Sequence, residues 1–436
     1  MVPPADPEPA AHPPALAVIG AGYVGLATAA GFASLGHRVA VGEADSDRLG
    51  ALQQSRLPIY EPGLGEVVRR ESEAGRLAFF ADNARAAAGA AAVFLAVPTP
   101  EGEGGSVDLS AVGRAIVSLT GAALAPAAPI VVKSSVPPGS WRKIRRMLDE
   151  AGMPSPLVVN PEFLQEGRAL DGVLNPHRVV VGGEDPAAVD LVAALHEPLG
   201  APIVRTDPTS AELIKYAANA YLATRLTFVN AVANLAEDLG ADVGDVLAGL
   251  AHDPRIGSHY LTPGPGYGGS CFPKDVRALI AAAAEHDHDL RLFRVVVETN
   301  DAQLDRVVAK LRDGLGDLDG AVIGLLGLAF KGGTDDTRSS PAVAIAGRLL
   351  DAGARVRAFD PAVRMAPPGV EAVPDAISAV AGADAVLVAT EWPEFAALDP
   401  ARLAAVMRGT LVVDARNLLD REAVAAAGLR YRGVGR

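Results

Sequence analysis

The sequence predicts an α/β protein in which two doubly wound parallel-sheet domains are joined by a helical domain with a long central helix. Three observations support this prediction. A short apolar strand over 16–19 is followed directly by a glycine-rich turn. The segment 209–239 contains neither glycine nor proline, and its apolar residues recur at helical spacing. After residue 320, short apolar segments again alternate with helical ones.

The glycine-rich turn has the spacing of a dinucleotide-binding turn, with glycines at Gly20, Gly22 and Gly25. The first glycine allows a tight turn, and the second lets the backbone approach a pyrophosphate. The third lets the following helix, expected over 24–35, pack on the strand. Glu43 stands eighteen residues after Gly25, at the end of a second strand. Its carboxylate is placed to accept both ribose hydroxyls of an adenosine, which favours NAD over NADP.

These features predict a Rossmann-like NAD-binding domain over residues 15–206. Short apolar runs, typical of strands that are buried on both faces, follow at 93–97, 130–132, 157–159 and 179–181. One parallel sheet is therefore expected over about 15–205. The preceding residues 1–14 contain six prolines and are expected to form a disordered tail.

A helical domain is expected over 207–314. Its long helix begins after Asp207 and ends before Gly240, two ordinary helix boundaries. At about 1.5 Å per residue the helix would span about 45 Å, which exceeds the width of a small domain. Such a helix normally joins two domains or forms a dimer interface, so we expect a homodimer. Further helices are expected at 242–251 and 275–313.

The last section, residues 315–436, is expected to repeat the α/β pattern without the full glycine triplet. Its predicted strands and helix are 322–326, 341–350 (the helix), 355–359, 384–388 and 411–413. Two nucleotide-sized clefts on one chain imply two nucleotide ligands, one of them a candidate substrate.

Composition excludes several classes of function. The net charge is −13, and the densest basic run, 142–146, is typical of a solvated helix face, so nucleic acid is not an expected partner. The longest apolar run, 86–97, is too short to cross a bilayer, and no signal peptide is visible. A single cysteine excludes an internal disulfide and fits a reducing cytoplasm. We expect a cytoplasmic protein with no membrane segment.

That cysteine, Cys271, lies in the segment 263–275, which contains four glycines and three prolines. Such a loop lets backbone approach a ligand closely. Lys274 can favour the thiolate, and Asp275 can handle protons. A lone cysteine is often only a small buried hydrophobe. The composition of the loop favours a nucleophile.

Several motifs together are similar to one family. They are GAGYVG at 20–25, LPIYEPGL at 57–64, VPTP at 97–100, KSSVP at 133–137, NPEFLQEG at 160–167, KY at 215–216, the cysteine loop, and FK at 330–331 with TDD at 334–336. On these motifs the chain resembles the UDP-glucose/GDP-mannose (nucleotide-sugar 6-) dehydrogenase family over residues 15–430.

The resemblance implies a four-electron oxidation, in which a sugar 6-hydroxyl becomes a carboxylate and two NAD⁺ are reduced. Cys271 would trap the aldehyde as a thiohemiacetal and then form a thioester that water cleaves. The chain is most similar to members that act on UDP-glucose, with GDP-mannose members the alternative. Members acting on UDP-N-acetylhexosamines commonly have histidine where this chain has Ser270.

Two other classes stay open. A two-electron β-hydroxyacid dehydrogenase would need neither Cys271 nor the α/β section after residue 320. A non-catalytic nucleotide-binding protein would not need the reactive residues together.

The resemblance also implies catalytic roles. Lys215 and Asn219, four residues apart, lie on one face of the long helix, and they would stabilise oxyanion charge at the oxidised carbon. Asp275 would hold a water molecule or take its proton, Glu162 would assist hydrolysis, and the hydroxyl of Ser135 would position a water molecule.

The implied dinucleotide contacts are Gly20, Gly22, Tyr23, Val24, Gly25, Glu43, Arg48, Thr99, Ser135, Glu166, Lys274 and Arg338. The implied substrate contacts are Glu162, Phe163, Leu164, Gln165, Glu166, Lys215, Asn219, Arg255, Tyr260, Leu261, Thr262, Pro263, Gly264, Gly268 and Lys331. Among these, Lys331 would meet the UDP diphosphate, and Arg255 would reach the site of a neighbouring subunit. No metal is expected.

Four positions depart from the family pattern. Glu43 stands where aspartate is commoner, and Ser135 where threonine is usual. Ser339 and Ala231 stand where glutamate is common. None of these departures removes a catalytic group.

Overall fold

The computed structural model describes residues 13–436. Residues 1–12 of the predicted disordered tail therefore lie outside the described part of the chain. The chain divides into two compact units. The first unit ends at Lys215, and the second comprises residues 216–436 together with the short segment 104–106. The predicted domain boundaries after residues 206 and 314 remain predictions.

The first unit is built on an eight-stranded sheet with the order β3-β2-β1-β4-β5-β6-β7-β8. The strands are β1 (Leu16–Ile19), β2 (Val39–Gly42), β3 (Leu77–Phe80), β4 (Ala92–Leu95), β5 (Ile130–Val132), β6 (Leu157–Val159), β7 (Val179–Gly183) and β8 (Ile203–Thr206). The first six strands are mutually parallel. β7 is antiparallel to β6 and parallel to β8.

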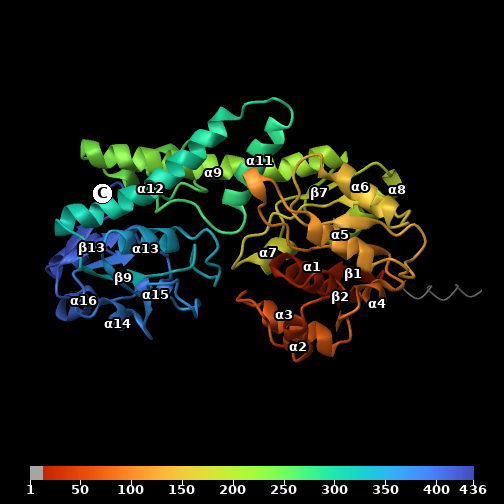
Figure 1. The fold of residues 1–436 in the computed structure, drawn as a ribbon, viewed down its shortest axis with the longest axis horizontal. Helices are drawn as coiled ribbons and strands as arrows, with labels where there is room; N and C mark the ends of the chain where they lie inside the picture. Colours follow the sequence, from red (N-terminus) through yellow and green to blue (C-terminus); the bar gives the residue numbers. More distant parts are fainter. Residues whose placement is uncertain (1–12) are drawn as a thin grey trace, which may run out of the picture. The chain divides into compact units, whose positions relative to one another are not determined.

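The prediction of one wholly parallel sheet over 15–205 was therefore wrong for its last two strands. Between β6 and β7 the chain forms only the six-residue helix α7 (Ala169–Leu174), which packs against α1 (Figure 1). The chain does not return across the sheet before β7 begins, so β7 starts near the edge where β6 ends. An apolar run of three or four residues has the same pattern in either direction, and the sequence did not distinguish them.

Helices cover both faces of this sheet. The larger ones are α1 (Tyr23–Ser34), α2 (Ser46–Gln53), α3 (Leu64–Glu73), α5 (Ser110–Ser118), α6 (Ser140–Glu150) and α8 (Pro186–His196), with the short α4 (Asn83–Ala87) between β3 and β4. The side chains of successive residues in β1 point to opposite faces of the sheet. Leu16 and Val18 pack with α1 and α8, and Ala17 and Ile19 pack with α5 and α6. The predicted doubly wound arrangement is confirmed.

The long helix α9 (Pro208–Leu239) confirms the predicted helix at 209–239. A buried carboxyl group fastens its first turns to α6. Glu212 accepts hydrogen bonds from the backbone N–H groups of Gly139 (2.6 Å) and Trp141 (2.7 Å), at the start of α6. The indole of Trp141 donates to the hydroxyl of Thr209 at 2.8 Å. These contacts set the position of Lys215, one turn further along α9.

The second unit contains three more helices before its sheet, namely α10 (Val243–Ala251), α11 (Phe272–Ala284) and α12 (Arg291–Leu315). The predicted helical stretch 275–313 is therefore two helices. The break at 285–290 contains Asp287, whose φ of 53° lies in the left-handed region. Neither glycine nor proline marks this break, so the sequence pattern did not reveal it.

The second sheet has six parallel strands in the order β11-β10-β9-β12-β13-β14. Its strands are β9 (Val322–Leu326), β10 (Arg355–Phe359), β11 (Glu371–Ala372), β12 (Ala385–Val388), β13 (Leu411–Asp414) and β14 (Arg430–Arg432). The predicted strands correspond to β9, β10, β12 and β13. The two edge strands β11 and β14 are short and polar. They lack the apolar run by which the other strands were predicted.

Helices also lie on both faces of the second sheet (Figure 1). Ile323 and Leu325 of β9 pack with α12, α13 (Pro341–Asp351) and the second half of α9. Leu326 packs on the opposite face with α14 (Ala376–Val380), α16 (Pro400–Val406) and α17 (Arg421–Ala426). The chain therefore carries two doubly wound sheets, as predicted.

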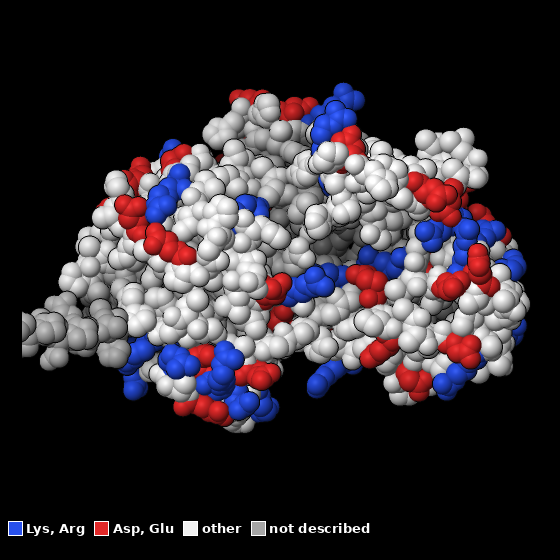
Figure 2. Space-filling view, turned by 180° about the vertical axis from the view of Figure 1, so that it is seen from behind, with Lys and Arg blue, Asp and Glu red and all other residues white. Residues whose placement is uncertain are grey.

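The surface is of mixed charge. On the face shown in Figure 2, lysine and arginine side chains alternate with aspartate and glutamate, without a large area of one sign. Among the helices at residues 13–436, none has both the length and the apolar character needed to span a membrane.

Glu212 should make stability depend on pH. Burial raises its pKa from 4.5 to about 8, although the hydrogen bonds from Gly139 and Trp141 oppose this shift. Since the folded pKa lies above the ordinary value, this carboxyl stabilises the fold when protonated. That contribution is present at low pH and is lost as the pH rises from about 4.5 to about 8.

We expect Glu212→Gln to remove this dependence, which amounts to at most about 1.4 kcal/mol per pH unit. Thermal unfolding of both proteins between pH 5 and 8 should show the wild-type Tm falling relative to that of the variant as the pH rises. Glu150→Gln, at the exposed end of α6, is the matched control. A Tm difference that does not change with pH would contradict the expectation.

Candidate active site

The glycine turn of the first unit leaves room for a ligand at one position only. A Cβ on Gly25 would lie 1.9 Å from the carbonyl oxygen of Gly20, and a Cβ on Gly20 would lie 2.5 Å from that of Ala96. A Cβ on Gly22, the N-cap residue of α1, would have no atom within 4 Å. Gly20 and Gly25 are therefore required for packing, whereas Gly22 leaves open space at a helix N-terminus, where phosphate binds well.

This turn lies where the strand order of the first sheet reverses. The chain proceeds from β1 outward to β2 and β3, and then returns to β4 on the other side of β1. In open α/β sheets such a reversal creates the crevice in which nucleotides bind. Tyr23 and Val24 begin α1 at this crevice, and Thr99 follows β4. The hydroxyl of Thr99 donates to the backbone oxygen of Ser135 at 2.9 Å.

Glu43 lies directly after β2 and is buried beside the turn. It accepts hydrogen bonds from the N–H groups of Ala21 (3.0 Å) and Asp45 (2.8 Å), and Arg48 lies 3.3 Å from the same carboxylate. A carboxylate has about four acceptor positions, so capacity remains for a ribose hydroxyl. The structure therefore brings together Glu43, Arg48 and the glycine turn.

A buried ion pair lies at the carboxyl edge of the same sheet. Lys215 Nζ is 2.9 Å from Glu162 Oε1, and the two side chains are 3% and 5% exposed. Ser135 Oγ lies 3.5 Å from the same oxygen, and the N–H of Leu164 donates to Glu162 Oε2 at 2.5 Å. Burial by itself would raise the pKa of Glu162, but Lys215, the N–H of Leu164 and the charge of Lys133 together outweigh it, and the net pKa is lowered. The Glu162 carboxyl is thus ionised.

The segment after Glu162 is held by a second carboxylate that sequence reasoning left without a role. Glu61 is buried and accepts hydrogen bonds from the N–H groups of Gly167 and Ala169, each at 2.8 Å. The guanidinium of Arg178 lies 3.6 Å from the ring centroid of Phe163. The one available signal was an acid inside the LPIYEPGL motif. Gln165 is exposed, and Glu166 is half-buried.

In the second unit, Cys271 is half-buried and is the N-cap residue of α11. The positive end of a helix dipole favours a thiolate over a neutral thiol. Asp275, one turn into the helix, is fully buried. It accepts from Asn219 Nδ2 at 2.6 Å and from Lys274 Nζ at 2.7 Å. The structure therefore brings together Asn219, Cys271, Lys274 and Asp275.

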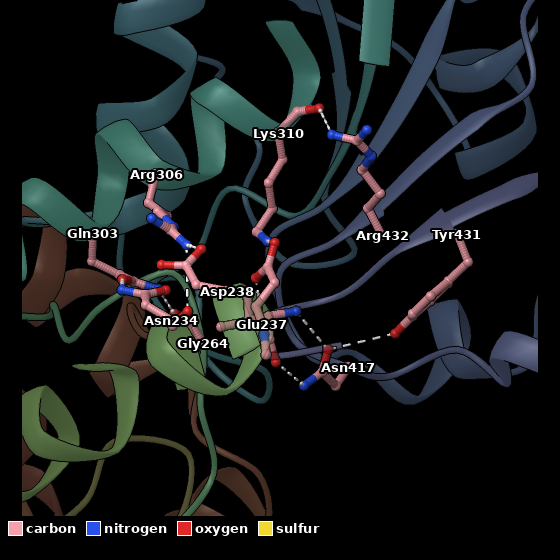
Figure 3. Close-up of polar contacts among 12 residues, drawn as sticks. Asn234, Glu237, Asp238, Gly264, Gln303, Arg306, Lys310, Asn417, Tyr431 and Arg432 are labelled. Carbon is pink, nitrogen blue, oxygen red and sulfur yellow. Dashed lines mark hydrogen bonds and ion pairs between the residues drawn. The ribbon is translucent and has the colours of Figure 1, made fainter. Parts of the chain in front are cut away.

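Amide side chains hold the loop that leads to Cys271, and Figure 3 shows two of them, Gln303 and Asn234, beside Gly264. The N–H of Gly264 donates to Asn230 Oδ1 at 2.8 Å, and Gln303 Nε2 donates to the Gly264 oxygen at 3.0 Å. Gln303 also accepts from Asn234 Nδ2 at 2.7 Å, which links α12 to α9. Asn300 accepts from the N–H of Tyr267 and donates to its oxygen. Sequence reasoning missed these amides, because their partners are remote along the chain.

The glycines nearest to Cys271 are required by close packing. A Cβ on Gly268 would lie 2.3 Å from the Ser339 oxygen, and a Cβ on Gly269 would lie 2.8 Å from the Phe330 ring. The cysteine loop is therefore packed against the segments that contain Lys331 and Ser339.

Other predicted contact residues lie near this loop in the sequence or on the segment packed against it. Arg338, a predicted dinucleotide contact, forms an ion pair with Asp336 at 2.6 Å. Tyr260 adopts a φ of 58°, while Leu261 and Pro263 are buried and Thr262 is exposed.

Arg416 is a candidate that sequence reasoning missed. It follows β13 at the carboxyl edge of the second sheet, and its guanidinium donates to the backbone oxygens of Phe330 (2.7 Å) and Ala389 (2.9 Å). A Cβ on Gly264 would lie 3.4 Å from Arg416 Nη1. A cation just after a strand, in a domain expected to bind a nucleotide, was the available signal.

Arg255 is not among the residues that the structure brings together. Its side chain is 88% exposed and forms an ion pair with Asp253 at 2.6 Å. Along residues 13–436, no group of three or more histidine, cysteine, aspartate or glutamate side chains is arranged to hold a metal ion.

Three segments of the chain match the three domains of one family. Residues 15–200 match the NAD binding domain of the UDP-glucose/GDP-mannose dehydrogenase family, residues 209–302 its central domain, and residues 324–421 its UDP binding domain. The chain belongs to this family. It is an NAD-dependent dehydrogenase, and the resemblance drawn from its motifs is confirmed.

Similar proteins cover nearly the whole chain. It is 42% identical to the UDP-glucose 6-dehydrogenase of Rhizobium meliloti, across 97% of this chain and 99% of that protein. It is 41% identical to the enzyme of the same name from Pseudomonas aeruginosa, across 97% of each chain. The solved UDP-glucose dehydrogenase of Pyrobaculum islandicum superimposes with a TM-score of 0.90 at 36% identity, across 100% of this chain and 99% of that one.

The residues of the first unit fit NAD. Open space at Gly22, the N-terminus of α1 and the acid after β2 are the features that a dinucleotide requires. Two glycine variants should separate this role from packing. Gly22→Ala should leave the Tm of the ligand-free protein unchanged, yet weaken NADH binding by at least about tenfold, roughly 1.4 kcal/mol, because the methyl group fills the phosphate position.

Gly25→Ala should instead lower the Tm, since its Cβ overlaps the Gly20 oxygen and overpacking costs about 1–3 kcal/mol. Calorimetric titration with NADH and thermal unfolding measure the two effects. Wild-type affinity in Gly22→Ala would show that the dinucleotide does not lie at this turn.

Proposed function

We propose that this enzyme oxidises carbon 6 of UDP-glucose to give UDP-glucuronate, with Cys271 as the nucleophile. The observation that supports this most directly is the position of the cysteine at the start of α11, beside a buried Asp275 held by Asn219 and Lys274. A two-electron dehydrogenase has no use for such a thiol. The UDP-glucose 6-dehydrogenases among the similar proteins support the choice of substrate.

In the proposed reaction, bound NAD⁺ supplies the hydride acceptor for both oxidation steps. The thiolate of Cys271 adds to the aldehyde carbon and forms a thiohemiacetal, which becomes a thioester in the second oxidation. The ammonium of Lys215 and the amide of Asn219 stabilise negative charge on the sugar oxygen. The buried Asp275 orients the amide of Asn219 for this role.

Hydrolysis of the thioester is assigned to Glu162. Its carboxylate is ionised and takes a proton from the attacking water molecule, while the hydroxyl of Ser135 orients that molecule. The new C–O bond forms as the C–S bond breaks, and the electron pair of that bond returns to the sulfur of Cys271. The products are a carboxylate and the regenerated thiol.

Substrate binding is assigned to both units. The segment 162–166 would contact the sugar, with the loop 260–264 and Gly268 contributing from the second unit. Lys331 and Arg416 are the cations proposed for the diphosphate, since charge-assisted hydrogen bonds are the strongest contacts that a phosphate makes. GDP-mannose remains the second candidate substrate. A solved GDP-mannose dehydrogenase from Pseudomonas is 29% identical to this chain, with a TM-score of 0.54.

A homodimer is proposed from the exposed stripe of α9. Tyr221, Phe228 and Leu235 recur every seven residues and are 62%, 51% and 57% exposed. Large apolar side chains at this spacing are typical of a helix that packs against another helix. Arg225 donates to the backbone oxygens of Ile256 and Gly257, which fastens the loop of Arg255 to the same helix. We propose that Arg255 reaches the substrate of the partner subunit.

We assign the reaction to the cytoplasm. A reducing compartment keeps the single cysteine as a thiol, which the proposed mechanism requires.

The stoichiometry of the reaction tests the proposal. The wild-type enzyme should form two NADH for each UDP-glucose consumed, and a panel that includes GDP-mannose and UDP-N-acetylhexosamines should identify the preferred sugar. Cys271→Ser should abolish formation of UDP-glucuronate while NADH affinity stays within about a factor of ten. Ser270→Ala is the matched control and should retain turnover. Formation of UDP-glucuronate at the wild-type rate by Cys271→Ser would exclude covalent catalysis.

Light scattering tests the dimer. The wild-type protein should have twice the monomer mass of 44.6 kDa. Replacing Tyr221, Phe228 and Leu235 together by glutamate should give a monomer, because charge would be buried in the interface. Leu292→Glu, an exposed leucine on α12, is the control and should stay dimeric.

A mixture of variant subunits tests the shared site. Mixing Arg255→Ala with Cys271→Ser subunits should restore some activity, because a mixed dimer can hold one site with both residues intact. A fully active monomer would overturn the shared site.

A further inference from the structure

The mechanism assigns no role to Lys133, although this lysine belongs to the KSSVP motif and is buried. It follows β5 directly and is 7% exposed. Its ammonium donates to Asn160 Oδ1 at 2.9 Å. A buried ammonium that does not balance a carboxylate in direct contact costs several kcal/mol. Such a group calls for an explanation beyond packing.

Asn160 is the anchor of this lysine. It is fully buried after β6, two residues before Glu162, and its Nδ2 donates to the backbone oxygen of Val180 at 2.7 Å. Because that oxygen only accepts, the amide orientation is determined, and Oδ1 faces both Lys133 and His196 Nε2 (3.2 Å). His196 therefore carries its proton on Nε2. Asn160 thereby joins the ends of β5, β6 and α8, two residues before Glu162 along the chain.

Two ammonium groups act on one carboxylate in this region. Lys133 and Lys215 both attract Glu162 electrostatically, and Lys215 forms an ion pair with it. Lys133 is held by Asn160, so its attraction for Glu162 does not depend on the contact that Lys215 makes. The effect of Lys133 on Glu162 therefore matters most when Lys215 donates to another group.

A cavity of about 310 Å³ adjoins the group, and Lys133, Asn160, Glu162 and His196 all line it. It has room for several water molecules, each of which occupies about 30 Å³ in the liquid. Water molecules in this cavity could therefore exchange a proton with the Glu162 carboxyl group without passing through the substrate.

We propose that Lys133 is a positioning residue that keeps Glu162 ionised while Lys215 donates to the substrate oxygen. The inference rests on the proposed function. In that reaction, Lys215 shares its charge with the developing oxyanion, and its attraction for Glu162 weakens at the stage when Glu162 must act as a base. The ammonium of Lys133 stays in place, because Asn160 holds it from the strand that leads to Glu162.

The charged and titratable groups around Glu162 come from five places. They are Lys215 on α9, Lys133 after β5, His196 at the end of α8, Arg168 and Asp171 at α7, and His177 and Arg178 before β7. Burial lowers the pKa of Lys133 to about 8; Glu162 raises it and Lys215 lowers it further. Burial, followed by the charge of Lys133, lowers the pKa of His196 to about 3. Of these two cavity-lining bases, only Lys133 changes charge near neutral pH.

The pH profile of turnover tests the role. In Lys133→Met and Lys133→Gln the pKa of Glu162 should rise, because a cation that favours its ionised form is gone. The low-pH side of the kcat profile should therefore move to higher pH by about one unit. At the lowest pH values, kcat should then be about tenfold below that of the wild type. Lys143→Met, an exposed lysine on α6, is the control and should keep the wild-type profile.

Infrared spectroscopy tests the same role without turnover and without a Lys133 variant. The difference between wild type and Glu162→Gln isolates the Glu162 carboxylate band. That band should shift as the wild-type protein is titrated through pH 8, when the neighbouring ammonium is neutralised. A band that does not change between pH 6 and 10, or Lys133 variants with the wild-type profile, would overturn the inference. Failure of the wild-type enzyme to oxidise any nucleotide sugar would instead overturn the proposed function.

Discussion

The buried ion pair between Lys215 and Glu162 is the constraint on which the first unit depends. Two charges that are almost wholly removed from water are stable only at short distance and with their remaining hydrogen bonds satisfied. Glu212 fastens α9 to α6 one turn before Lys215, and the N–H of Leu164 supports Glu162 from the other side. A helix start and a strand end that are 53 residues apart along the chain are thereby held at contact distance.

The second unit contains a similar buried cluster, in which a carboxylate is held by an ammonium group and an amide. Asp275 is fully buried, and Asn219 and Lys274 occupy its two oxygens. Lys215 and Asn219 lie one turn apart on a single continuous helix, so α9 contributes one member to each polar cluster. From residue 209 to 239 the helix contains neither glycine nor proline, so no residue that commonly kinks a helix lies between Lys215 and Asn219.

Both sheets direct their polar residues to the carboxyl ends of their strands. Thr99, Ser135 and Glu162 follow β4, β5 and β6, while Lys331 and Arg416 come after β9 and β13. The strands supply mainly apolar packing, and these polar residues lie in the segments after them, whereas Lys215, Asn219 and Cys271 are contributed by α9 and the start of α11. Buried polar side chains hold the loops of both sites, namely Asn160 and Glu61 in the first unit and Gln303 in the second. These three side chains are hydrogen-bonded, since an unsatisfied buried group would cost about 1–3 kcal/mol.

The sequence by itself determined the features that local patterns encode. The glycine turn, the long helix, the main strands and the cysteine loop all depend on residues close together in the chain, where backbone sterics and period decide the outcome. Only the tertiary structure decided the direction of β7, the break before α12, and the partners of Glu61, Glu212, Lys133 and Arg416. These depend on contacts such as that of Glu212 with Gly139, 73 residues away. A buried acid and an exposed acid look alike in a sequence, because burial is a property of the folded chain.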